Sequence, residues 1–400
     1  MNEVRIFVCA GEASGDLHAA ALMAELKRRL APRRVLFRGF GGDAMREAGC
    51  QLFFHTDQTS VIGFTAVLAR LPFFLRMRRE IQEEIDAWQP DVVITVDYPG
   101  MNLRIDEFAH AHGYKTVHYI CPQVWAWHRG RIPKLARIMD RLLCIFPFEP
   151  ALFEKTGLDA RYVGHPLVDR ARETRAQERR QLPWGDKKYH IALLPGSRRG
   201  EITRILPRLL QAAALLEKRT GNACSFLIPA SSHQMRELIE SLLAKQMTKE
   251  LRDLPLAVVD GSAREVLLQA DAAAVASGTA TLEACLMRCP TVLVYAVGWL
   301  TAIMAHLLIR GVKWIGLANI VAGREVMPEL LQSKFTPENL CNELNGLLRE
   351  PVKRASMLRG LDVTNAKLGD GGASQRAADC ICELLEGTVT PPVGEAGGAG

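Results

Sequence analysis

Asp97 directly follows the most apolar stretch that we expect to be a strand. Residues 91–96 have the sequence Asp-Val-Val-Ile-Thr-Val, and Asp-Tyr-Pro-Gly-Met-Asn comes next. A continuous apolar run of this kind is typical of a strand that a parallel sheet buries on both faces. Ligands of such sheets lie at the carboxyl ends of the strands, and a carboxylate there can take a proton from an alcohol. The sequence therefore marks Asp97 as a candidate general base, with a helix cap or an ordinary turn residue as the alternative.

A glycine-containing loop at residues 195–200 has the composition of an anion-binding turn. Its sequence is Pro-Gly-Ser-Arg-Arg-Gly, between a predicted strand and a predicted helix. Small residues such as Ser197 let backbone N–H groups approach an anion, and the helix dipole adds to the attraction. Arg198 can hold phosphate oxygens with its forked guanidinium group. The loop lacks the Gly-Lys-Ser/Thr of a Walker sequence, and an ordinary glycine turn is the alternative.

A second loop of this type covers residues 276–283, with the sequence Ala-Ser-Gly-Thr-Ala-Thr-Leu-Glu. Ser277 and Thr279, on either side of Gly278, can cap a helix or donate to a phosphate. Glu283, one turn later, can accept hydrogen bonds from the two hydroxyls of a ribose. Either loop alone is weak evidence. Two such loops on one sheet, with a carboxylate at ribose distance, favour a nucleoside diphosphate as the ligand.

The first predicted strand leads into the sequence Gly-Glu-Ala-Ser-Gly-Asp. Gly11 and Gly15 suit a tight turn into a helix. Their spacing differs from Gly-x-Gly-x-x-Gly, so the loop does not support a dinucleotide site. Glu12 and Ser14 are polar groups that can hold a sugar hydroxyl. A capped helix start, with Ser14 or Asp16 as the cap, is the alternative.

Residues 61–79 combine dense apolar residues with a basic end. The apolar side chains include Phe64, Leu68, Leu71 and Phe74. Such a segment can lie in a membrane interface with its arginines on lipid phosphates, and a pair of core helices is the alternative. Residues 291–309 carry no charge, and we expect a buried strand, a turn and a short apolar helix from Trp299 rather than a membrane span.

Predicted strands alternate with helical patterns along most of the chain. The expected strands are residues 5–10, 35–39, 91–96, 115–120, 190–194, 223–229, 256–260, 272–276 and 291–295. This alternation is typical of parallel, doubly wound sheets. The sequence therefore predicts an α/β protein with two Rossmann-like domains, whose strand-end loops converge on a central cleft.

A highly charged stretch at residues 170–180, closed by Pro-Trp-Gly-Asp, interrupts the alternation. We interpret it as a linker with a solvated helix. We therefore expect a first domain at residues 1–168, a second at 169–365, and a C-terminal helix at 366–387 that packs back on the first domain. Residues 388–400 are rich in proline, glycine and alanine and are predicted to be disordered.

Composition excludes several classes of protein. Of the 400 residues, 48% are hydrophobic and 24% charged, which excludes a disordered chain and a polytopic membrane protein. The net charge of +6 is too small to demand a nucleic-acid partner, but it suits an anionic substrate or lipid surface. The ten cysteines lack Cys-x-x-Cys and zinc-site spacings, so we expect reduced thiols in a cytosolic protein without a signal peptide or a bound metal.

Seven motifs follow one another along residues 3–385. They are Gly-Glu-Ala-Ser-Gly-Asp at 11–16, Val-Trp-Ala-Trp at 124–127, Phe-Pro-Phe-Glu at 146–149, Val-Gly-His-Pro at 163–166, Leu-Leu-Pro-Gly-Ser-Arg at 193–198, Ala-Ser-Gly-Thr-Ala-Thr-Leu-Glu at 276–283 and Asn-Ile-Val-Ala-Gly-Arg-Glu at 319–325. As a set, these motifs resemble the lipid-A-disaccharide synthase family, glycosyltransferase family 19. The resemblance implies a GT-B fold, with an acceptor- and membrane-facing first domain and a second domain that binds the UDP-sugar.

The resemblance also implies the reaction. UDP-2,3-diacylglucosamine and 2,3-diacylglucosamine 1-phosphate (lipid X) would give the β-1',6-linked disaccharide 1-phosphate and UDP, with inversion. Asp97 matches the proposed general base of the family, and Arg198, Glu283 and Asn319 match polar positions of its nucleotide-sugar site. Because no acidic cluster suited to Mg²⁺ is evident, we expect a metal-independent transfer without a cofactor, in which Arg198 and helix N-termini stabilise the leaving UDP.

The resemblance implies a cytoplasmic enzyme that associates peripherally with the anionic inner face of the cytoplasmic membrane. A homodimer is compatible with the sequence. Gly100 and Met101 stand where some relatives carry Asp-Phe, which concentrates the base role on Asp97. The alternatives are another GT-B enzyme acting on UDP-N-acetylglucosamine, such as the epimerase or the peptidoglycan transferase, and a non-catalytic nucleotide-sensing module. The acyl-sized apolar surfaces disfavour the other GT-B enzymes.

Overall fold

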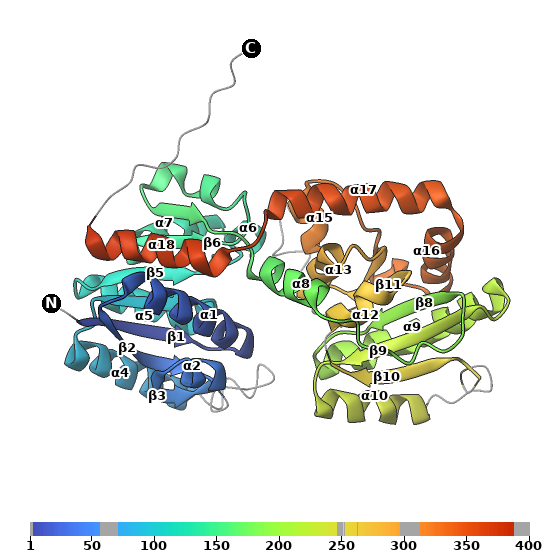
Figure 1. The fold of residues 1–400 in the computed structure, drawn as a ribbon, viewed down its shortest axis with the longest axis horizontal. Coiled ribbons are helices and arrows are strands. Elements are labelled where there is room, and N and C mark those ends of the chain that lie inside the picture. The colour runs from blue at the N-terminus through green and yellow to red at the C-terminus, as the bar shows by residue number, and fades with distance from the viewer. Residues whose placement is uncertain are drawn as a thin grey trace, which may run out of the picture. The chain divides into compact units, whose positions relative to one another are not determined.

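The computed structural model describes residues 3–56, 71–127, 129–245, 251, 253–261, 263–296 and 313–387. These residues form two compact units. Unit 1 comprises the chain up to Pro166 and from Gly372 onward, and unit 2 comprises Leu167–Gly371. Each unit is a sheet covered by helices (Figure 1). The expected tail at 388–400 lies outside the described residues.

The sheet of unit 1 has seven strands, all paired in parallel in the order β3-β2-β1-β4-β5-β6-β7. The strands are β1 (Glu3–Ala10), β2 (Arg34–Gly41), β3 (Cys50–His55), β4 (Val92–Val96), β5 (Lys115–Tyr119), β6 (Arg141–Cys144) and β7 (Asp159–Tyr162). All five residues of β4 are buried, as its unbroken apolar sequence predicts. The first six strands have the Rossmann order.

Helices of unit 1 cover both faces of this sheet. They are α1 (Ala13–Leu30), α2 (Asp43–Glu47), α4 (Leu71–Trp88), α5 (Pro99–Ala111), α6 (Val124–Trp127), α7 (Ile132–Ile138) and α18 (Ala373–Glu386), with 3-10 turns at Arg129–Arg131, Pro150–Leu152 and Glu154–Thr156. Helices α4 and α5 bury Met77, Ile81 and Ile105 against Phe7 and Val93 of the sheet. Helix α18 packs along α1 (Figure 1), although more than 340 residues separate them in sequence.

Charged contacts attach α18 to the strands of unit 1. Lys115 Nζ lies 2.9 Å from Leu384 O and 3.0 Å from Leu385 O, where it satisfies carbonyl groups at the C-terminal end of the helix. Arg141, which is buried, donates to the carbonyl of Cys380, and Arg161 pairs with Glu383. The last helix is therefore part of the first unit.

Unit 2 contains a six-stranded parallel sheet in the order β10-β9-β8-β11-β12-β13. The strands are β8 (Tyr189–Leu194), β9 (Cys224–Ala230), β10 (Leu256–Asp260), β11 (Ala272–Ala276), β12 (Thr291–Tyr295) and β13 (Glu329–Leu331). This order is that of a Rossmann sheet. The predicted α/β class with two Rossmann-like units is confirmed.

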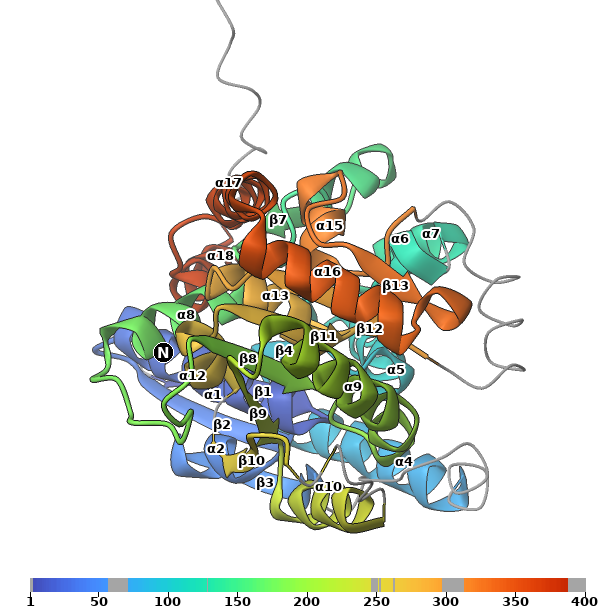
Figure 2. The same ribbon diagram turned by 90° about the vertical axis from the view of Figure 1, so that its right-hand side faces the viewer.

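Helices also cover both faces of the second sheet. They are α8 (Pro166–Ala176), α9 (Arg199–Thr220), α10 (His233–Lys245), α12 (Ala263–Gln269), α13 (Thr279–Leu286), α15 (Leu317–Ala322), α16 (Pro337–Arg349) and α17 (Pro351–Leu368), with a 3-10 turn at Gln332–Lys334. Helices α9 and α16 lie side by side (Figure 2). Helices α12, α13 and α17 form a second contacting group.

Candidate active site

Asp97 is the first residue after β4, and it begins an unusual turn. The backbone φ angle is 51° at Asp97 and 48° at Tyr98, in the left-handed region that residues with a side chain seldom adopt. The N–H of Asp97 still continues the sheet, because it donates to Tyr119 O at 2.9 Å. Backbone strain of this kind costs about 1–3 kcal/mol per residue and clusters at active sites.

Asn102 holds this turn from the first helical turn of α5. Its side chain is fully buried. Nδ2 lies 2.7 Å from Asp97 O, 3.1 Å from Val96 O and 3.3 Å from Cys9 O. The amide therefore ties the tips of β1 and β4 together and fixes the backbone of Asp97. No local sequence pattern indicates this role of Asn102, because its partners are carbonyl groups at the ends of two separate strands.

The carboxyl of Asp97 lies in a poorly solvated position. Burial raises its pKa, against the opposing effects of the Tyr98 N–H and the charge of His118. The N-cap of α5 is Tyr98, and among the described residues no side chain caps that helix. The alternative that Asp97 is a helix cap is therefore not observed. A raised carboxyl pKa brings a general base closer to neutral pH, where proton transfer is most efficient.

Gly11 and Glu12, the first residues after β1, lie beside this turn. A β-carbon on Gly11 would overlap the ring of Tyr98, so the glycine makes room for that ring. Burial raises the pKa of Tyr98, and the nearby charge of Glu12 raises it further. The structure thus brings Gly11, Glu12 and Asp97 together around Tyr98.

The remaining residues of the first loop, Ser14, Gly15 and Asp16, differ in their exposure and contacts. Ser14 is exposed. A β-carbon on Gly15 would lie 3.4 Å from Val96 O, so its small size lets α1 approach β4. Asp16 is buried and caps α2 instead of its own helix, since its carboxylate accepts from the N–H groups of Gly42, Ala44 and Met45 at 2.7–3.1 Å. The alternative in which Asp16 caps its own helix is therefore not observed.

Three of the sequence motifs form one aromatic cluster in unit 1. Trp125 lies edge-on to Phe146 and Phe148, which stack with a centroid distance of 5.6 Å, and His165 lies 5.2 Å from Phe146. Glu149 is fully buried among them. No local sequence pattern predicts this cluster, because its contacts join positions up to 40 residues apart.

The carboxylate of Glu149 is saturated with donors. Oε2 accepts from the N–H groups of Ile145 and Phe146 at 3.0 Å, and Oε1 accepts from Trp125 Nε1 at 3.2 Å. Burial raises the pKa of Glu149 to about 7, although these three hydrogen bonds oppose the rise. The group therefore closes the turn after β6 and changes its charge near neutral pH.

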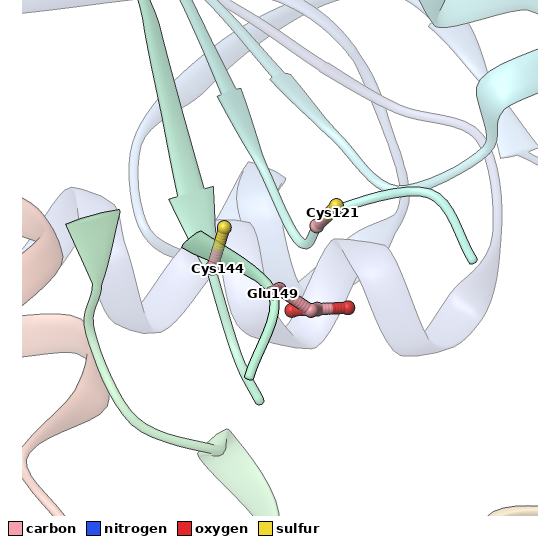
Figure 3. A group of neighbouring side chains, drawn as sticks. All are labelled: Cys121, Cys144 and Glu149. Carbon is pink, nitrogen blue, oxygen red and sulfur yellow. The ribbon is translucent and has the colours of Figure 1, made fainter. Parts of the chain in front are cut away.

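Glu149 lies next to two thiols, as Figure 3 shows. Ligand atoms of Cys121, Cys144 and Glu149 lie within 4.8 Å of one another. A metal would need thiolates, but burial raises the pKa of Cys144 well above its ordinary value. The hydrogen bond from Cys144 lowers the pKa of Cys121, but burial and the charge of Glu149 together outweigh it, so this pKa is also raised. Both thiols are therefore protonated in this structure, and Glu149 is already engaged by three N–H donors.

In unit 2, the loop after β8 already binds a carboxylate. The N–H groups of Ser197 and Arg198 lie 3.2 and 3.4 Å from Oε2 of Glu201. Gly196 has a φ of 112°, and a β-carbon there would overlap Glu201. The side chain of Arg198 is 82% exposed, which leaves it able to reach a ligand. The predicted anion-binding turn thus holds an anionic group of its own chain.

The loop after β11 leads into α13 and carries the other nucleotide candidates. Ser277 is half-buried and donates its N–H to Val294 O at 3.1 Å, whereas Gly278 and Thr279 are exposed. Glu283 Oε1 forms an ion pair with Arg264 Nη1 at 2.7 Å, and both side chains are largely buried. Arg264 also donates from Nε to Thr174 Oγ1 at 3.2 Å. Sequence reasoning missed Arg264, which holds Glu283 in place.

Asn319 is fully buried, and its amide is fully engaged within the protein. Nδ2 donates to Met327 O at 2.8 Å and Glu329 Oε1 at 2.9 Å. Oδ1 accepts from the N–H groups of Val326 and Met327 at 2.8 and 2.9 Å. These contacts leave the side chain no free donor for a ligand. The side chain of Asn319 therefore orders the turn after α15.

Comparison of the whole chain with known proteins identifies its family. A family model described as lipid-A-disaccharide synthetase matches residues 6–370. This chain belongs to that family. A lipid-A-disaccharide synthase of Myxococcus xanthus (strain DK1622) is 40% identical over 387 residues, which are 96% of this chain and 98% of the relative. The chain is accordingly a glycosyltransferase of lipid A biosynthesis, as the sequence motifs predict.

Solved structures extend the comparison to the fold. The UDP-GlcNAc 2-epimerase of Neisseria meningitidis, bound to UDP-GlcNAc, matches 96% of this chain and 100% of its own with a TM-score of 0.60 and 11% identity. The calicheamicin glycosyltransferase CalG4 matches 98% and 100% of the chains with a TM-score of 0.59 and 16% identity. The synthetase therefore shares the GT-B fold with transferases and epimerases of very different sequence.

Only some of the residues that are predicted to contact a membrane lie in the part of the chain that the structure describes. Phe64, Leu68, Trp299 and the side chain of Leu71 lie outside the described residues. Phe74 is half-buried and packs against the core cluster that contains Met77. Within the described ranges, no helix has both the length and the apolar character needed to cross a bilayer.

Proposed function

We propose that this synthetase transfers a 2,3-diacylglucosaminyl group from UDP to the 6-hydroxyl of 2,3-diacylglucosamine 1-phosphate. The proposal depends mainly on the position and environment of Asp97. A half-buried carboxyl with a raised pKa stands at the carboxyl end of the central strand β4, in a strained turn that Asn102 fixes. This is the kind of group that a displacement by an alcohol requires.

In the proposed reaction, Asp97 accepts the proton of the acceptor hydroxyl. The oxygen of that hydroxyl forms a bond to the anomeric carbon, while the bond from this carbon to the UDP phosphate breaks. The electron pair of the broken bond leaves with UDP, and the configuration at the anomeric carbon inverts. Glu12 and Ser14, on the adjacent loop of unit 1, are proposed to hold sugar hydroxyls.

Unit 2 is proposed to bind the UDP part of the donor. The turn after β8 offers the N–H groups of Ser197 and Arg198, together with an exposed guanidinium group. A phosphate at this turn would compete with Glu201 both for the N–H groups and for the guanidinium group of Arg198, which lies 3.9 Å from Glu201 Oε1. Glu283, held by Arg264, is proposed to accept from the ribose hydroxyls. We propose that no cofactor or metal takes part.

Both substrates carry acyl chains, so we propose that the protein works while peripherally bound to the inner face of the cytoplasmic membrane. Helix α4 supports this proposal. Its Leu75 is 42% exposed, and the side chains of Arg76 and Arg79 are 74% and 79% exposed. These arginines pair with Glu80 and Glu83 in the following turn, which reduces their attraction to anionic lipid.

The test of this function is an assay of UDP release with purified protein and UDP-2,3-diacylglucosamine, with and without 2,3-diacylglucosamine 1-phosphate. We expect release that depends on the acceptor, a disaccharide 1-phosphate as product, and unchanged activity in excess EDTA. Release without an acceptor would favour hydrolysis or epimerisation, and binding of UDP without release would favour a sensing module. Strict metal dependence would contradict the proposed stabilisation of UDP.

A further inference from the structure

The buried amide of Asn102 lies between the ends of two strands and the turn that carries Asp97. Its Nδ2 lies 2.7 Å from Asp97 O, 3.1 Å from Val96 O and 3.3 Å from Cys9 O. The side chain has no exposed surface. Carbonyl oxygens can only accept hydrogen bonds, so the amide nitrogen must be the atom that faces them. A side chain without a hydrogen-bond donor could not make these contacts.

Two of these contacts lie on either side of the Cα atom of Asp97. Val96 O belongs to the peptide group that precedes this atom, and Asp97 O belongs to the peptide group that follows it. The N–H of the preceding group also donates to Tyr119 O at 2.9 Å. Because peptide groups are planar, holding both of them sets φ and ψ at Asp97. The direction in which the Asp97 side chain leaves the backbone is set at the same time.

The conformation that Asn102 holds in this way is unfavourable for the backbone. The φ angles of 51° at Asp97 and 48° at Tyr98 lie in the left-handed region, which is costly for residues with a side chain. Oδ1 of Asn102 is buried without a hydrogen-bond partner among the described residues, which is also costly. Such costs persist mostly where a structure needs an exact side-chain position for its function.

The third contact of Asn102 reaches the neighbouring strand. Cys9 lies on β1, which pairs in parallel with β4. The loop that contains Glu12 begins directly after β1. The amide therefore holds the ends of the two strands together at the point where the loops with Glu12 and Asp97 begin.

We propose that Asn102 is a positioning residue of the glycosyl transfer, which holds the Asp97 carboxyl in the orientation that proton transfer requires. The inference rests on the proposed function of Asp97 as the base. Asn102 touches neither substrate and acts through the backbone of Asp97. A base must lie within hydrogen-bond reach of the proton that it accepts, and a displacement of about 1 Å can cost about 10²-fold in rate.

The test is a double-mutant cycle of Asn102→Ala and Asp97→Asn, measured as acceptor-dependent UDP release. Asn102→Ala alone should lower kcat by about tenfold to a hundredfold, because it removes the donor that orients the base. KM for both substrates should change by less than about twofold, since no substrate contact is removed. In the Asp97→Asn background, the same change should lower kcat by less than about twofold, because the base is already absent.

Thr116→Val is the matched control for the loss of a buried hydrogen bond in unit 1. Thr116 is fully buried, and its Oγ1 donates to Asp140 Oδ2 at 2.9 Å. It lies near the start of β5, at the opposite end of the sheet from the turn that follows β4. The control should lower the melting temperature without lowering kcat.

A wild-type kcat in Asn102→Ala, or equal losses of kcat in the two backgrounds, would overturn the inference. If a thermal melt shows that Asn102→Ala does not fold, Asn102→Ser takes its place in the cycle, because its hydroxyl keeps one donor. A smaller loss that disappears in the Asp97→Asn background is then expected, and an equal loss in both backgrounds again contradicts the inference. Full activity of Asp97→Asn would instead refute the proposed base, and the inference with it.

Discussion

The ring of Tyr98 occupies the space that a side chain on Gly11 would need. The two residues belong to loops that follow β1 and β4, which pair in parallel. Contact between them fixes the first loop against the turn that carries Asp97. The absence of a β-carbon at position 11 is therefore a condition for the position of the candidate base.

Gly11→Ala should displace Tyr98 and, through the shared turn, Asp97. A displacement of about 1 Å at a reacting group can cost about 10²-fold in rate, so we expect a loss of this order in acceptor-dependent UDP release. The matched control is Gly100→Ala, because a β-carbon there meets nothing within 4 Å. Equal activities of the two variants would show that the Gly11–Tyr98 contact is not needed.

Asp97→Asn keeps the shape of the side chain but removes the base. We expect turnover to fall by about 10²-fold or more, the usual contribution of general-base catalysis. Binding of UDP, measured by calorimetry, should be unchanged, since the proposed nucleotide site lies in unit 2. Glu107→Gln on α5 is the control, because its side chain is half-exposed and pairs with Lys134. Turnover near the wild-type value in folded Asp97→Asn would remove Asp97 from the mechanism.

The nucleotide site can be tested by UDP affinity alone. A charge-assisted hydrogen bond is worth about 1.5–3 kcal/mol, so Arg198→Ala should weaken UDP binding about tenfold to a hundredfold. Glu283→Gln should weaken uridine and UDP alike, because the ribose is common to both. Arg204→Ala, an exposed change on the same helix as the loop after β8, serves as control. Unchanged calorimetric affinity in both site variants would refute the site.

Glu149 gives a prediction about stability and pH. Its pKa is about 7 in the folded protein and 4.5 when unperturbed. The folded state therefore keeps a proton that the unfolded chain loses between these values, and the contribution of Glu149 to stability is lost as pH rises from about 4.5 to 7. The difference corresponds to about 3 kcal/mol.

Glu149→Gln cannot titrate, so its melting temperature should rise relative to the wild type between pH 5 and 8. The exposed Glu154→Gln, on the following 3-10 turn, is the control and should show no such trend. A constant difference between Glu149→Gln and the wild type across this range would mean that Glu149 does not change its charge there.

Local patterns predicted most strands of the described chain but not β3, β6, β7 and β13. Strands β6 and β7 have only four residues each and begin with Arg141 and Asp159. Arg141 is buried nonetheless, because Asp159 and the carbonyl of Cys380 on α18 compensate its charge. A contact with a helix more than 200 residues away leaves no periodic signal near the strand.

The candidate site likewise contains residues that a local pattern indicates and residues that depend on contacts distant in sequence. The place of Asp97 directly after β4 could be predicted, because the unbroken apolar run marks that strand. The pairing of His118 with Asp106 depends on the register between β4 and β5, and no local pattern sets that register. The sequence pattern that suggests a ribose contact for Glu283 does not reveal its ion pair with Arg264, because Arg264 lies on another helix.

Membrane binding by α4 can be separated from core packing with two single changes. Leu75 is 42% exposed, whereas Phe74 packs against the core cluster of unit 1. Leu75→Ser should lower co-sedimentation with anionic vesicles and leave the melting temperature unchanged. Phe74→Ser should lower the melting temperature, because truncating a core residue lowers the free energy of unfolding by roughly 2–5 kcal/mol. If Leu75→Ser lowers the melting temperature but not the co-sedimentation with vesicles, this face of α4 is excluded as the docking surface.

The ion pairs on α4 allow a second test of membrane binding. Arg79 Nε lies 2.8 Å from Glu83 Oε1, so the carboxylate of Glu83 offsets part of the positive charge that Arg79 would present to lipid phosphate. Glu83→Gln frees the guanidinium group and should strengthen binding to anionic vesicles by about 1 kcal/mol, an effect that falls with added salt. Arg79→Gln should weaken binding by a similar amount. Vesicles of zwitterionic lipid are the control, because neither change should alter binding to them. Equal binding of all three proteins to anionic vesicles would place the membrane contact on another part of the chain.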